Sequence, residues 1–271
     1  MFLKERTYRD SPTAQPLGRP PRPLSRLILL GAALITACSF WSLLAANIDL
    51  PPFILPTPAL VGERFLRALA GGSLFLHIGV TLSEVFGGLG LGLLVAVFLG
   101  ILLARSLPLE RLLSPFIIAS QAVPVVAIAP LMVIWFGPGL FSKVLICALI
   151  VFFPILVNTV VGLRSVPADL RDLMRSLMAT RWQTLRLLEI PAALPVLFGG
   201  LRIGATLSVI GAVVGEYVGA DRGLGFLINL GRGQYDTPLV FVAVLTLIAI
   251  ALTLYGAVAW LESRVLQWNR K

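Results

Sequence analysis

The stretch RSVPADLRDLMRSLMATRWQTLRLLEIPAALP, Arg164 to Pro195, is the longest polar interruption in an otherwise apolar chain. It carries five arginines and three acidic residues between two apolar runs. Within it, leucine, methionine and tryptophan recur at the spacing of an amphipathic helix. Pro167 suits the first turn of one helix, and Thr180 can cap a second, which we expect to end at Ile190 before the prolines that follow. The stretch predicts two short amphipathic helices on one face of a membrane protein, with an apolar stripe exposed for a partner.

The composition is that of a membrane protein. Of the 271 residues, 58% are hydrophobic and 13% are charged, and the mean hydropathy is +0.94. Soluble domains carry about 25% charged residues. The net charge of +9 could suggest nucleic acid as a partner, but its distribution along the chain, described below, argues against that. Cys38 and Cys147 both lie in apolar runs, so neither a disulfide framework nor a zinc site is expected.

Apolar stretches of about 20 residues predict six transmembrane helices in an all-α membrane protein. We place them at residues 27–46, 78–104, 113–136, 144–163, 192–215 and 239–261. Residues 1–26 are expected to form a disordered basic tail, 47–77 a linker with an interfacial helix, and 262–271 a short terminal tail. The basic start could also belong to a signal peptide, but the run 27–46 is longer than the apolar part of such a peptide.

The distribution of basic residues predicts the orientation. With the N-terminus inside, the cytoplasmic segments hold 16 lysines and arginines and the outer segments, in which Lys143 is counted, hold 5. This bias obeys the positive-inside rule. It places the polar stretch 164–190 and both termini in the cytoplasm.

Motifs for catalysis are missing from the sequence. There is no G-x-x-x-x-G-K-[ST] phosphate loop, so we do not expect the chain to be its own ATPase. The chain has a single histidine, His77, which argues against a cluster of metal ligands, and no nucleophile-elbow sequence accompanies the serines. We therefore expect no catalytic residue, no metal and no cofactor in this chain.

Polar residues inside the apolar runs are the candidates for a translocation pathway. Glu84 and Arg202 have opposite charges in spans of opposite direction, and we expect them to compensate each other, as a structural ion pair or as a gate contact. Gln121 and Asn158 are candidate pore-lining groups, with hydrogen bonding between helices as the alternative. Glu216 lies near the outer end of a predicted span, where solvation at the interface is enough to explain it.

The polar stretch resembles the cytoplasmic coupling loop, or EAA loop, of bacterial ABC importer permeases. That pattern is E-A-A-x-x-x-G, nine residues, then I-x-L-P. Its spacing is kept throughout, with Asp172 at the glutamate, Met178 at the glycine, Leu188 at the isoleucine, Ile190 at the leucine and Pro191 at the proline. Two alanines are replaced by larger residues, and Met178 stands where a glycine would favour positive φ.

The resemblance implies the MetI-like permease fold, with residues 78–261 as the permease domain and 164–190 as the coupling loop. It implies a homodimer in the bacterial cytoplasmic (inner) membrane, two copies of a separate ATPase that uses ATP, and an extracytoplasmic binding protein; no nucleic acid is involved. The residues that it assigns to ATPase coupling are Asp172, Leu173, Leu177, Met178, Arg181, Trp182, Leu185, Leu188, Ile190 and Pro191.

The substrate class rests on a finer resemblance. The run GAVVGEYVGADRGLGFL, residues 211–227, resembles permeases for thiamine-precursor pyrimidines and riboflavin more than those for nitrate, sulfonate or taurine. Arg202 is the only basic residue inside the six predicted spans, which disfavours a small anion. An aromatic compound is therefore expected, with nitrate, sulfonate or taurine as the alternative. An ion-coupled secondary transporter and a membrane scaffold are further alternatives, but the first leaves the amphipathic helices unexplained.

Overall fold

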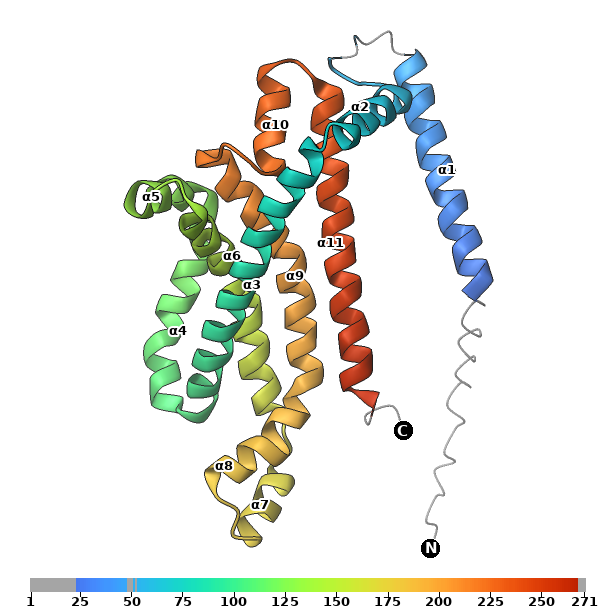
Figure 1. Ribbon diagram of the computed structural model, residues 1–271. Coiled ribbons are helices and arrows are strands. Elements are labelled where there is room, and N and C mark those ends of the chain that lie inside the picture. Colours follow the sequence, from blue (N-terminus) through green and yellow to red (C-terminus); the bar gives the residue numbers. More distant parts are fainter. Residues whose placement is uncertain (1–22, 48–50, 52, 268–271) are drawn as a thin grey trace, which may run out of the picture. The chain divides into compact units, whose positions relative to one another are not determined.

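The computed structural model describes residues 23–47, 51 and 53–267, and every regular element in that part of the chain is a helix (Figure 1). The chain divides into two units, residues 1–49 and 50–271. The first holds α1 (Pro23–Asn47). The second holds α2 (Pro58–Ala70), α3 (Ser73–Arg105), α4 (Leu107–Ala122), α5 (Val125–Phe136), α6 (Leu140–Arg164), α7 (Ala168–Ser176), α8 (Arg181–Thr184), the π-helical turn η1 (Leu185–Glu189), α9 (Ile190–Gly219), α10 (Leu224–Gly233) and α11 (Thr237–Val265). The predicted all-α fold is confirmed.

Four helical segments among the described residues are long and apolar enough to cross a membrane. They are Ser73–Arg105, Leu140–Arg164, Arg181–Gly219 and Thr237–Val265, and they match four of the six predicted spans. A fifth span results if the bent pair α4 and α5 counts as one. In α1 the apolar stretch found among the described residues is Gly31–Ala45, and the first span, 27–46, stays a prediction. The tail 1–26 lies almost entirely outside the described residues.

Helix α6 is the centre of the second unit, and α3 and α9 pack closely against it (Figure 1). Glycines make this approach possible. Cys147 of α6 lies between Gly88 of α3 and Gly211 of α9, and a β-carbon at Gly211 would come within 2.8 Å of the Cys147 α-carbon. Because apolar side chains gain little by leaving lipid for protein, such close packing supplies much of the association energy between spans.

Replacing Gly88 with alanine is therefore expected to destabilise the bundle by about 1–3 kcal/mol, because the new β-carbon would overlap that of Cys147. Thermal unfolding of the purified permease in detergent would measure the loss. Gly90→Ala, on the same helix with no atom within 4 Å of the new β-carbon, is the matched control and should unfold at the wild-type temperature or above. Equal destabilisation by both changes would contradict this packing.

The third predicted span, 113–136, is not one straight helix. It breaks at Val123, and α4 and α5 meet at 95°. Pro124 explains the break, because it has no N–H to donate and forces the preceding residue out of the helical region. Val123 has the extended ψ of 120° that this rule requires.

The helix after Thr180 does not end at Ile190, as the sequence led us to expect. It continues through η1 into α9 and ends only at Gly219. In the π turn the amide of Ile190 donates to the carbonyl of Leu185, five residues earlier. The wider hydrogen bonding of this turn accommodates Pro191, which has no N–H to donate. The interfacial helix expected within residues 47–77 corresponds to α2, which ends at Ala70, because Gly72 at φ +69° turns the chain into α3.

Candidate functional site: the coupling loop and the buried polar cluster

The coupling loop, residues 164–190, projects from one end of the bundle as α7, α8 and η1 (Figure 1). Thr180 caps α8 as predicted: its hydroxyl accepts from the amide of Gln183, whose side chain accepts from the amide of Thr180. This reciprocal capping box satisfies two amides at the helix start. The predicted pair of short amphipathic helices is thus present, with α8 continuing into α9.

Met178 makes the turn between α7 and α8 in the left-handed conformation, at φ +55°. The amide of Ala179 donates to the carbonyl of Met174, and that of Met178 to the carbonyl of Arg175. This is the Schellman pattern that usually has glycine at its left-handed position. A methionine therefore adopts the backbone geometry that the family pattern gives to glycine, with its side chain 90% exposed.

Met178→Gly is expected to leave the turn intact and to change stability by less than about 1 kcal/mol, since relief of left-handed strain is offset by the greater freedom of an unfolded glycine. Met178→Val should instead destabilise the loop, because a β-branched residue resists positive φ. Protease sensitivity of the loop in the purified permease would compare the two. A loop that tolerates valine as well as glycine would contradict the left-handed turn.

Most of the predicted coupling residues are exposed, but one is buried and two are half-buried. Leu173, Leu177 and Trp182 are all more than half exposed, and Asp172 binds Arg175 at 2.8 Å beside them.

Leu185 is buried against Leu163 and Ala193, so it joins the loop to α6 and α9 and takes no part in the exposed surface. Its placement among the exposed docking residues was wrong, because its side chain packs into the core between α6 and α9. Leu188 and Pro191 are half-buried, and Ile190 is only just exposed.

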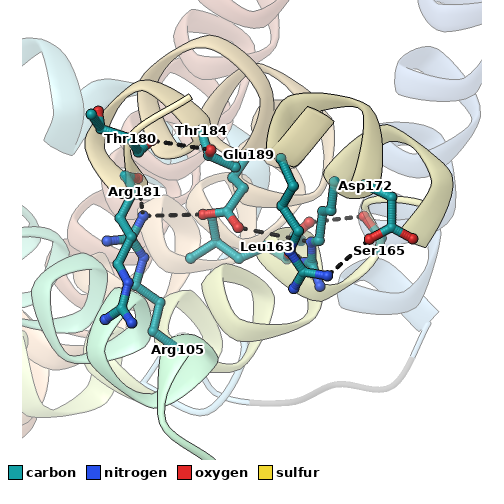
Figure 2. Close-up of polar contacts among 11 residues, drawn as sticks. Arg105, Leu163, Ser165, Asp172, Thr180, Arg181, Thr184 and Glu189 are labelled. Atoms are coloured by element: carbon teal, nitrogen blue, oxygen red, sulfur yellow. Dashed lines mark hydrogen bonds and ion pairs between the residues drawn. The ribbon is translucent and has the colours of Figure 1, made fainter. Parts of the chain in front are cut away.

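The loop is braced against the ends of the spans by ion pairs that sequence reasoning missed. Glu189 lies 3.3 Å from Arg105 of α3 and 3.8 Å from Arg171 of α7, and Arg105 also donates to the carbonyl of Arg181 (Figure 2). Arg164 forms a bidentate pair with Glu110 of α4, at 2.6 and 2.5 Å. The sequence feature that could have indicated these ion pairs is the presence of acidic residues, Glu110 and Glu189, close to the ends of spans that carry arginines.

The predicted partnership of Glu84 and Arg202 was wrong. Glu84 is fully buried and pairs with Lys143 of α6 at 3.2 Å, whereas Arg202 pairs with Glu262 of α11. Lys143 had been counted with an outer segment, yet it lies in the first turn of α6 and is almost fully buried. Glu84 and Glu216 both lie near the end of the bundle opposite the coupling loop. Arg202 precedes Glu216 by 14 residues of α9, which is roughly 21 Å along the helix axis. Arg202 therefore lies at a different depth from Glu84.

Glu216 is also buried, at 1% exposure, so interfacial solvation does not explain it. It accepts a hydrogen bond from Thr81 at 2.6 Å and another from the amide of Gly225 at the start of α10. Thr81 in turn accepts from the amide of Leu224. The buried polar cluster, Thr81, Glu84, Lys143 and Glu216, therefore joins α3, α6, α9 and α10.

The two predicted pore-lining amides behave differently. Asn158 is half-buried and donates to the carbonyl of Pro154 on its own helix at 2.8 Å, which supports a role inside α6. Gln121 is exposed and lies in the last turn of α4, beside the break at Val123.

Comparison with known proteins decides the family. Residues 88–267 match the model of the binding-protein-dependent transport system inner membrane component. This chain belongs to that family. It is 49% identical over 240 residues to the riboflavin transport system permease protein RibX of Chloroflexus aurantiacus, covering 89% of this chain and 90% of that protein. It is 36% identical to the formylaminopyrimidine transport permease protein ThiX of Halalkalibacterium halodurans, covering 85% and 92% of the two chains.

The fold agrees with that of a solved ABC transporter. An inward-facing structure of the methionine transporter MetNI matches with a TM-score of 0.64 at 21% identity, covering 72% of this chain and 97% of that one. The MetI-like fold expected from the coupling loop is thus confirmed. This chain is the multi-pass membrane permease of a binding-protein-dependent ABC importer, in which hydrolysis of ATP belongs to a separate subunit.

Proposed function

We propose that this ABC permease carries riboflavin or a closely related flat aromatic vitamin or vitamin precursor. The supporting observation is its 49% identity, over nine-tenths of both chains, to a permease named for riboflavin transport. The charges agree with an uncharged aromatic substrate, because Lys143 and Arg202 are each paired with a carboxylate in the bundle. A small anion would favour unpaired basic groups along its path.

We further propose that two copies of the chain assemble around the pathway. No residue of α4 is buried, and α5 buries only Ala129. A helix broken at membrane depth leaves backbone groups without partners, which is tolerated only where protein or a water-filled cavity covers them. A second copy would cover the break at Val123, and Gln121 would then face the pathway.

Each coupling loop would bind one ATPase subunit in the cytoplasm, and the binding protein would deliver substrate at the opposite end. The continuity of α8, η1 and α9 supports a direct mechanical connection, since a push on Trp182 acts on the same helical segment that ends at Gly219. ATP-driven closure of the ATPase subunits would tilt this segment, so that the pathway opens first to one side of the membrane and then to the other. The excess of basic residues on the coupling-loop side supports this orientation.

Expression of the permease, with its ATPase and binding protein, in a riboflavin auxotroph that lacks its own importer would test the substrate. Growth at low external riboflavin is expected only with all three subunits. A parallel strain that depends on taurine for sulfur tests the alternative. Rescue on taurine without rescue on riboflavin would contradict the proposed substrate while leaving the ABC mechanism intact.

A further inference from the structure

A basic pocket of about 590 Å³ lies between the coupling loop and the ends of the spans. Four arginines line it: Arg105 closes α3, Arg171 and Arg175 come from α7, and Arg181 begins α8. Glu189 is the only acid in the lining, so the lining carries three more positive than negative charges. Its volume falls within the range of about 300–1,000 Å³ typical of small-molecule sites.

The arginines have donors to spare. The guanidinium of Arg181 makes no hydrogen bond or ion pair with any residue in the described ranges, although Figure 2 shows its backbone carbonyl held by Arg105. The Nε of Arg171 is buried without a hydrogen-bond partner, and its ion pair with Glu189 is long, at 3.8 Å. Within the described ranges, the guanidinium of Arg175 binds only Asp172, which lies outside the pocket lining.

We propose that this pocket binds a phosphate group, carried by an anionic phospholipid of the adjacent leaflet or by a soluble phosphorylated molecule. A guanidinium group can donate two parallel hydrogen bonds to the oxygens of one phosphate. A bound anion would also relieve the repulsion among the four arginines. Ala104 and Leu163, in the last turns of α3 and α6, also line the pocket, so it lies at the ends of two candidate membrane spans, where headgroups would be within reach. Basic pockets between spans on the cytoplasmic side are typical headgroup sites.

The exposed docking residues argue against an acidic side chain of the ATPase as the occupant. Leu173, Leu177 and Trp182 form the apolar part of the proposed docking surface, and none of them lines the pocket; of the predicted coupling residues, only Arg181 does. A bound phosphate would join α3, α7 and α8. It would therefore hold the coupling loop at a fixed position against the bundle, beyond what the pair of Arg105 and Glu189 provides.

Native mass spectrometry of the full-length permease in a neutral detergent tests the proposal, with phosphatidylglycerol and phosphatidylcholine as the lipid probes and pyrophosphate as the soluble probe. One tightly retained phosphatidylglycerol per chain is expected, without matching retention of phosphatidylcholine. Arg181→Gln should weaken this binding roughly five-fold, and Arg175→Gln together with Arg181→Gln roughly twenty-five-fold. Arg186→Gln is the control, since it removes the same charge from the same loop outside the pocket.

The probes distinguish the two sources. Retention of phosphatidylglycerol that pyrophosphate does not displace assigns the site to lipid, and binding of pyrophosphate with competition against the lipid assigns it to a soluble phosphate. Binding of neither probe would overturn the proposal, as would an equal loss in Arg186→Gln. Release of the bound phosphate on adding the ATPase subunit would also overturn it, because the pocket would then belong to the subunit interface.

Discussion

Lys143→Met is expected to destabilise the permease by about 3–5 kcal/mol, which is the usual cost of leaving one member of a buried ion pair without its partner. Lys143 is the only cation in the buried polar cluster, and it lies 3.2 Å from Glu84. Its loss would leave Glu84 and Glu216 as two carboxylates close enough to interact, with no positive charge in the cluster. Thermal unfolding in detergent would measure the effect.

The double variant Glu84→Gln with Lys143→Met should recover most of that loss, because the two carboxylates no longer repel each other and Glu216 keeps its hydrogen bonds from Thr81 and the amide of Gly225. It should also keep transport, since a fully buried pair has no contact with a substrate. Arg67→Met is the control: it breaks an exposed pair with Glu63 and should cost less than about 1 kcal/mol. A double variant that folds normally but cannot transport would show that the pair belongs to the pathway.

Trp182→Ala is expected to weaken binding of the ATPase subunit by roughly 30-fold or more, since a tryptophan at the centre of an interface is worth about 2–4 kcal/mol. The side chain is 65% exposed on the coupling loop and packs into no core cluster of the described residues. The permease itself should therefore fold normally. Copurification of the ATPase and the stimulation of its activity by binding protein would report the loss.

Two further variants separate docking from folding. Trp260→Ala removes an exposed tryptophan from α11, where it stacks on Arg264, and should leave ATPase binding unchanged. Leu185→Ala removes a buried side chain and should lower the stability of the permease by about 2–5 kcal/mol. If Trp182→Ala assembled as the wild type does, the proposed docking surface would be wrong.

Local chemistry made the coupling loop predictable. Helical spacing, the capping threonine at Thr180 and the spacing of the family pattern all depend on residues close in sequence. The same is true of the long apolar spans. The π turn was not predictable in this way, because it results from burying Leu185 against α6 while Pro191 starts the next helix, and this balance depends on the packed bundle.

The prediction gave the buried charges the wrong partners for a related reason. Charge sign and span direction allowed Glu84 to pair with Arg202, but depth along the helices decides the partner. Lys143 was counted with an outer segment because it stands at the edge of an apolar run, and the approach of α3 and α9 to α6 buries it. The glycines between these helices are the sequence feature that could have indicated so close a packing.

The proposed role of this chain is to form the membrane pathway of an ATP-driven importer for riboflavin. Uptake of labelled riboflavin into proteoliposomes that contain the permease and its ATPase, with binding protein and ATP supplied on the appropriate sides, tests this role most directly. Uptake is expected to require ATP hydrolysis and binding protein, and to continue when ion gradients are collapsed. Uptake driven by an ion gradient without ATP would contradict it.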